Sequence, residues 1–161
     1  MKRLKKAVRN FFGFETPEAD PESVLEAGRQ KLAGEMARYN QSLAASISLC
    51  EVLRGQIRTL ESREETFRSA LDQQLRSGAD EETGGETALR WENIRRELAA
   101  LRPQLEEAEA TCKQITAARE AALDTARKQL EELKGTLDAA RIHQALTEIE
   151  RLGRTKSKHV F

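Results

Sequence analysis

The chain has 161 residues, of which 34% are charged and only 4% aromatic, and its 27 Lys and Arg balance its 27 Asp and Glu. This composition is typical of long helices and coiled coils, and it excludes a thick, aromatic-rich globular core. The sequence has no run of about 18 apolar residues, as a transmembrane helix requires, and no apolar stretch of a secretory signal. We therefore expect an all-α protein that is cytoplasmic or peripheral on the inner face of the cell membrane.

Residues 1–14 predict a short amphipathic helix that binds membranes. Its apolar face holds Leu4, Val8, Phe11 and Phe12. Five basic residues surround that face, namely Lys2, Arg3, Lys5, Lys6 and Arg9. Such a helix inserts its apolar side into the bilayer interface while its cations contact anionic headgroups. The alternative is that this helix packs on the rest of the chain as part of a core.

The next segment, residues 15–21, is an acidic linker with two prolines. It ends in Asp20-Pro21, a helix-start signal with Asp as the N-cap and Pro in the first turn. From Leu32 to Leu75, apolar side chains recur at steps of three and four, and only Glu64 interrupts them. These side chains fall on one stripe of a helix, so a single helix is predicted from Pro21 to Arg76.

A glycine-rich, acidic turn at residues 77–85 is predicted to be the tip of a helical hairpin. A second long helix is predicted from Glu86 to about Leu152, with Pro103 bending it rather than ending it because the apolar stripe continues in phase. A short turn between long helices makes them antiparallel neighbours. The coiled-coil-like hairpin would therefore cover residues 22–153, with a flexible basic tail at residues 154–161.

The second predicted helix is longer than the first, so its last turns would extend beyond the start of its partner. Leu146, Ile149 and Leu152 would then have no apolar contact within the same chain. We expect these three residues to contact other copies, which predicts a homo-oligomer or polymer.

Residues that carry chemistry are few. Cys50 and Cys112 lie on the apolar stripes without a further Cys or His at metal-ligand spacing, so we interpret them as small buried hydrophobes in a reducing compartment. His143 and His159 have no nucleophile or carboxylate at a catalytic spacing. We expect no enzyme activity, no cofactor and no metal. Nucleic-acid binding is not expected either, because the body between the basic ends is acidic and no reader motif occurs.

The order of these elements resembles a known family. A basic amphipathic helix precedes Asp20-Pro21-Glu22, and a long hairpin with an acidic, glycine-containing tip follows. The stretch from Ala99 to Ile115, which contains Ala-Leu-Arg-Pro-Gln-Leu-Glu-Glu-Ala-Glu, is similar to the helix after the tip in the same family. About residues 1–150 resemble the phage-shock protein A family and its plastid and cyanobacterial vesicle-inducing relatives, the bacterial branch of the ESCRT-III superfamily.

The resemblance implies an ESCRT-III-like, membrane-remodelling protein whose hairpins pack side by side in helical rods or rings. It also implies that the residues of the first helix insert into lipid. Family members usually continue into further helices that reach the hairpin tips of neighbouring subunits, and this chain is expected to lack them. Its lattice contacts would come from the hairpin faces or from a longer paralogue.

Two functions therefore remain open from the sequence. The first is a membrane-associated scaffold that self-assembles into helical or ring polymers on anionic lipid and remodels or protects the cytoplasmic membrane. The second is a soluble coiled-coil adaptor or regulator that binds a partner protein, for example in stress-response regulation.

Overall fold

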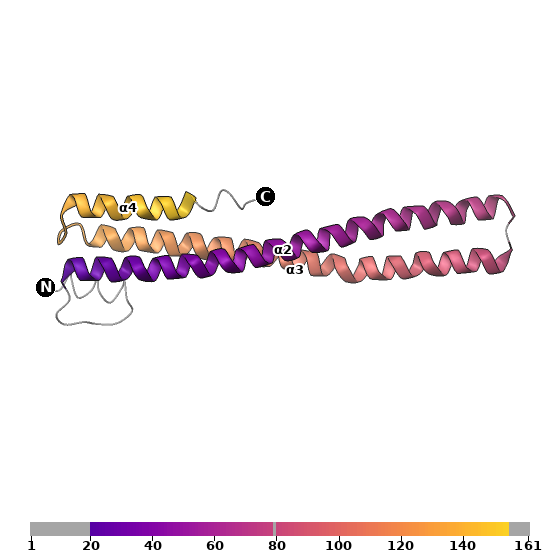
Figure 1. Ribbon diagram of the computed structural model, residues 1–161, viewed down its shortest axis with the longest axis horizontal. Coiled ribbons are helices and arrows are strands. Elements are labelled where there is room, and N and C mark those ends of the chain that lie inside the picture. The colour runs from indigo at the N-terminus through magenta and orange to yellow at the C-terminus, as the bar shows by residue number, and fades with distance from the viewer. Residues whose placement is uncertain (1–19, 79, 155–161) are drawn as a thin grey trace. The chain divides into compact units, whose positions relative to one another are not determined.

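The computed structural model describes residues 20–78 and 80–154, which form three helices joined by turns (Figure 1). These helices are α2 (Pro21–Arg76), α3 (Glu81–Glu132) and α4 (Ala139–Arg154). The prediction of an all-α protein is confirmed for these residues. The predicted amphipathic helix at residues 1–14, and all of the predicted tail except Arg154, lie outside the described residues.

Helix α2 begins and ends where the sequence indicates. The backbone carbonyl of Asp20 accepts the first helical hydrogen bond, from the Val24 amide at 3.0 Å. Pro21 occupies the first turn, where its missing N–H leaves no helical hydrogen bond unmade. Glu22 adds negative charge at the positive end of the helix dipole.

The tip between α2 and α3 is shorter than predicted. Gly78 has a φ of 72°, a left-handed conformation that favours glycine, and it lies in the turn after α2. Helix α3 then begins at Glu81 rather than Glu86, because an Asp80 carboxylate oxygen accepts the Thr83 amide at 2.8 Å. This N-cap places Gly84 inside the helix despite its weak helix propensity.

The prediction that the second long helix continues without a break to about Leu152 is wrong. Helix α3 stops at Glu132, residues 133–138 form a turn, and α4 starts at Ala139. Asp138 caps α4, since its carboxylate accepts the Ala140 amide at 3.2 Å and its carbonyl accepts the Arg141 amide at 3.0 Å. The apolar spacing continues through this turn, which is why periodicity alone suggested one uninterrupted helix.

The described chain divides into two compact units. The first unit comprises residues 20–44 and 113–154, and the second comprises residues 45–112. In the first unit α4 lies alongside α2 and α3 (Figure 1) and closes a core to which all three helices contribute. The buried members of this core are Leu25, Leu32, Met36, Leu123, Ala126, Leu130, Leu133, Ile142, Ala145 and Ile149.

The second unit is an antiparallel pair of helices. The ion pair between Arg54 and Glu109 at 3.0 Å and the one between Arg102 and Glu61 at 3.3 Å link residues whose numbers rise on α2 and fall on α3. Ile57, Leu60, Ile94 and Leu98 form one buried cluster between the two helices. Pro103 is exposed on α3, and the helix continues through it, as the phase of the stripe predicted.

Candidate functional site

The residues predicted to mediate self-assembly lie in the core of the first unit instead. Ile149 is only 4% exposed, and Leu146 and Leu152 pack, partly buried, against the same core. Because the turn at residues 133–138 folds α4 back, these side chains meet α2 and α3 of their own chain. The premise that they lack an intrachain partner is therefore wrong, and their assignment to self-assembly loses its basis.

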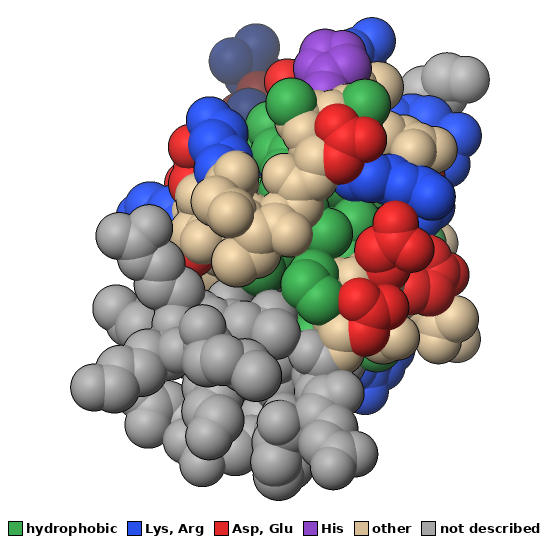
Figure 2. Space-filling view, turned by 90° about the vertical axis from the view of Figure 1, so that its left-hand side faces the viewer, with side chains coloured by type: hydrophobic (Ala, Val, Ile, Leu, Met, Phe, Trp, Pro, Cys, Tyr) green, Lys and Arg blue, Asp and Glu red, His purple; other side chains and the backbone are tan. Residues whose placement is uncertain are grey.

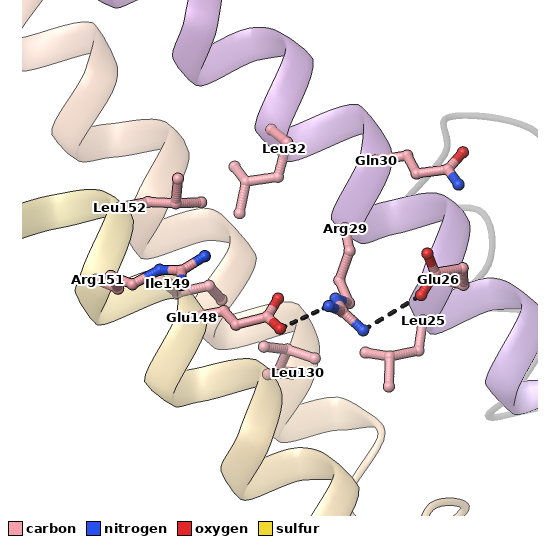
Figure 3. A pocket seen from close by; sticks show the side chains of 12 residues that line it. Leu25, Glu26, Arg29, Gln30, Leu32, Leu130, Glu148, Ile149, Arg151 and Leu152 are labelled. Atoms are coloured by element: carbon pink, nitrogen blue, oxygen red, sulfur yellow. Dashed lines mark hydrogen bonds and ion pairs between the residues drawn. The ribbon is translucent and has the colours of Figure 1, made fainter. Parts of the chain in front are cut away.

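Helix α4 is also attached to α2 by charged side chains at the edge of this core. Arg29 pairs with Glu148 on α4 and with Glu26 on its own helix, the latter at 3.2 Å (Figure 3). Arg141 on α4 lies 3.7 Å from Glu22 on α2. Both contacts join the two helices across the opening of the core, but partly exposed pairs of this kind contribute only about 0–1 kcal/mol each.

A cavity of about 280 Å³ opens beside Arg29. Figure 3 shows Leu130 and Ile149 on its apolar side and the carboxylate of Glu148 directed at Arg29 on its polar side. Figure 2 shows the end of this unit at which α2 begins, where apolar side chains lie among both acidic and basic ones. The guanidinium of Arg29 already binds two carboxylates, so the cavity has no strong preference for an anion.

A charged side chain, Arg119, occupies the interior of the first unit. It is 0% exposed, and its Nε donates to Asn40 Oδ1 on α2 at 2.9 Å. Its Nη2 donates to the carbonyl oxygen of Leu152 in the last turn of α4. Its Nη1 has no hydrogen-bond partner among the described residues. Burial lowers the pKa of this guanidinium, because desolvation disfavours the charged form.

Arg119 therefore links all three helices through neutral acceptors. Sequence reasoning missed this role, although one signal was present. Arg119 stands where the apolar stripe of the second predicted helix is interrupted, between Ile115 and Ala122. A basic residue on the apolar face of a helix indicates either that the core is interrupted there or that the side chain is buried and hydrogen-bonded. The structure shows the second case.

The two cysteines face each other inside the second unit. Cys50 and Cys112 are 0% and 4% exposed, both are free thiols, and their Sγ atoms lie 4.0 Å apart. Burial, and next the neighbouring Cys50 thiol, raise the pKa of Cys112. The prediction that both are buried on the apolar stripes is confirmed. In the described part of the chain, no three His, Cys, Asp or Glu side chains form a group that could hold a metal ion.

Apolar side chains are incompletely buried in the part of the second unit nearest the tip. Between Leu60 on α2 and Ile94 on α3, none of the described residues is buried. Leu75 is 70% exposed and Leu89 is 61% exposed, while Leu71 and Trp91 are partly buried. The apolar stripe of α2 thus continues past the point where α3 covers it.

Trp91 explains the one break in the stripe of α2. Its indole N–H donates to Glu64 Oε1 at 3.4 Å, and the guanidinium of Arg95 lies over its ring, 5.3 Å from the centroid. Glu64 therefore accepts from a side chain of the opposite helix. Farther along α2, Gln74 Oε1 is buried without a hydrogen-bond partner among the described residues.

The predicted membrane-binding residues cannot be placed beside these features. Leu4, Val8, Phe11 and Phe12, with Lys2, Arg3, Lys5, Lys6 and Arg9, all lie outside the described residues. Within residues 20–78 and 80–154, no helix has a stretch long and apolar enough to cross a bilayer. Comparisons with family models, curated proteins and solved structures find no match for this chain.

Proposed function

We propose that the protein is a membrane-associated scaffold that assembles with copies of itself, in the manner of the phage-shock protein A family. The observation that carries this proposal is the incomplete burial of apolar side chains near the hairpin tip, where Leu75 and Leu89 are exposed and Leu71 and Trp91 are partly buried. We call these four residues the tip surface. Each exposed apolar side chain favours a contact, because burying it against a partner releases water from both surfaces.

The strength expected of a single contact is small. Fully burying one large apolar side chain yields about 1.5–3 kcal/mol, and association costs at least about 4 kcal/mol in lost translational and rotational freedom. A tip surface of four side chains therefore binds one partner weakly. Repetition of the contact along a polymer makes later contacts intramolecular, and the assembled state becomes stable.

The second support comes from the sequence of residues 1–14. Its apolar residues and five cations have the composition of a helix that lies in the bilayer interface. One copy of such a segment binds anionic lipid weakly and reversibly, whereas many copies on one polymer bind tightly. Assembly through the tip surface and attachment through residues 1–14 thus reinforce each other.

The test is a double substitution in the tip surface. Leu75→Glu with Leu89→Glu places charges at two exposed positions, so the helical content should be unchanged while large assemblies disappear from sedimentation profiles and negative-stain images. The matched control is Leu49→Glu with Val52→Glu, which introduces the same charges at two exposed apolar residues of the same unit. Assembly should survive in the control.

Two results would contradict the proposal. If the tip variant assembles like the unmodified protein, the tip surface is not the contact. If the unmodified protein is a discrete species that anionic liposomes do not change, the alternative holds, and the tip surface serves a soluble adaptor that binds another protein.

A further inference from the structure

We propose that Cys50 and Cys112 form a site of oxidative modification, at which a small disulfide oxidant converts two thiols into a bond between α2 and α3. The inference is separate from the proposed scaffold function. It rests on two buried thiols whose sulfur atoms lie 4.0 Å apart on facing helices of one unit.

The surrounding contacts hold the two cysteines opposite each other. The ion pair between Arg54 and Glu109, at 3.0 Å, lies one helical turn from Cys50 on α2 and from Cys112 on α3. Leu53 and Ala108, each about one helical turn from one of the cysteines, are also buried. A disulfide has an S–S distance of about 2.05 Å, so the two sulfur atoms have to approach by roughly 2 Å. This approach requires rotation of both side chains and a small movement of the helices.

The reaction is an ordinary thiol–disulfide exchange. The thiolate of one cysteine attacks a sulfur atom of the oxidant, which leaves one oxidant thiolate and a mixed disulfide. The thiolate of the other cysteine attacks the protein sulfur of that mixed disulfide and releases the second oxidant thiolate. Both protein thiols lose their protons to solvent, and the two electrons reside on the reduced oxidant.

Burial determines how fast this exchange proceeds. The attacking species is the thiolate, and the buried environment of Cys112 disfavours it. Oxidation is therefore slow while the helices are closed, and it accelerates with rising pH and with local opening of the pair. Once formed, the bond joins residues 62 positions apart and restricts the unfolded chain, which stabilises the folded hairpin.

The experiment oxidises the full chain with glutathione disulfide at pH 8 and low protein concentration, where contacts between copies are fewest. Intact mass under denaturing conditions should fall by about 2 Da, the loss of two hydrogens in a disulfide. Peptide mapping without reductant should recover the Cys50 peptide linked to the Cys112 peptide. The midpoint of urea unfolding should rise and should return to its starting value after reduction.

The single variants Cys50→Ala and Cys112→Ala are the matched controls. Neither can form the internal bond, so each should end as a glutathione adduct or a free thiol, with no rise in the unfolding midpoint. Should either variant fail to fold, the mass and peptide map of the unmodified protein still decide the question. The proposal is overturned if that protein keeps both thiols under conditions that oxidise its urea-unfolded form. It is also overturned if the recovered disulfides join different chains.

Discussion

Arg119 shows how one residue can fix the position of a helix. Taking a guanidinium out of water costs several kcal/mol, and here no carboxylate offsets that cost among the hydrogen bonds that it makes. The compensation comes from the amide oxygen of Asn40 and from a carbonyl at the negative end of the α4 dipole. The residue that is most costly to bury is thus the one that contacts all three helices.

Replacing Arg119 with Ala should lower the free energy of unfolding by about 2–4 kcal/mol, because it leaves a cavity and removes both hydrogen bonds. Urea unfolding monitored by circular dichroism measures this change. The control Arg38→Ala alters an exposed arginine of α2 in the same unit and should change stability by less than about 0.5 kcal/mol. A variant of Arg119 as stable as this control would show that the buried guanidinium does not hold the helices together.

Asp80 predicts a pH dependence at the start of α3. Its side chain accepts a hydrogen bond from the side chain of Thr83 and, next in size, from the Thr83 amide, and these bonds lower the pKa of the carboxyl. The folded pKa therefore lies below the unfolded value. The stabilisation is fully present above the unfolded pKa of about 3.9, and it is lost as the pH falls through the folded pKa.

Asp80→Asn is the informative substitution for this prediction. Asparagine is as good an N-cap as aspartate but does not titrate, so the first turn of α3 should form in both proteins at neutral pH. The Thr83 amide resonance should shift at acidic pH in the unmodified protein and stay constant in the variant. Equal shifts in both proteins would mean that Asp80 is not the titrating group.

At the level of elements, α2 was predictable over its whole length whereas α3 and α4 were not. A start at Asp20-Pro21 and an apolar stripe that only Glu64 interrupts define α2. The turn at residues 133–138 has a weaker signal, because Leu133 and Leu137 keep the helical spacing and both pack on the core. Its only local signs are Gly135, a poor helix former, and Asp138, a good N-cap. The turn is favourable because it lets α4 fold back and bury its apolar side chains against α2 and α3.

Helix α4 gives a prediction that separates a core role from an assembly role. Ile149→Ala should lower the free energy of unfolding of the first unit by about 2–4 kcal/mol, because it removes buried atoms and leaves a cavity. Limited proteolysis should then cut within α4, where the unmodified protein resists. Thr147→Ala, an exposed position of the same helix, is the control and should leave the proteolysis pattern unchanged. If Ile149→Ala abolishes assembly without changing stability, the residue belongs to a contact between copies after all.

At the level of the whole molecule, the class of fold follows from the composition and from the helical spacing of apolar residues, while the sites depend on tertiary contacts. The buried cysteines could be predicted because both lie on apolar stripes. Neither the pairing of Trp91 with Glu64 nor that of Arg29 with Glu148 could be predicted, because each joins side chains of two helices whose register depends on the packed structure. The membrane segment remains a prediction from its residue pattern alone.

Phe11→Glu with Phe12→Glu should abolish co-sedimentation with anionic liposomes while leaving the circular dichroism spectrum nearly unchanged. Each substitution removes a large apolar side chain from the predicted inserting face and adds a charge that anionic lipid repels. The control Phe14→Glu changes a phenylalanine beyond Gly13 and should reduce binding less. Undiminished sedimentation of the double variant would locate lipid binding elsewhere in the chain.

The absence of buried residues between Leu60 and Ile94, among those described, has a consequence for engineering. Segments of equal length could be deleted from both sides of the tip, beyond Phe67 on α2 and Trp91 on α3, without removing a side chain that packs on the core, so a shortened hairpin should retain its fold. A folded reporter domain inserted at residues 77–78 should likewise be tolerated, since loop tips with few contacts accept insertions best. The outer part of the hairpin could thus be exchanged for another segment in order to change which surfaces it contacts.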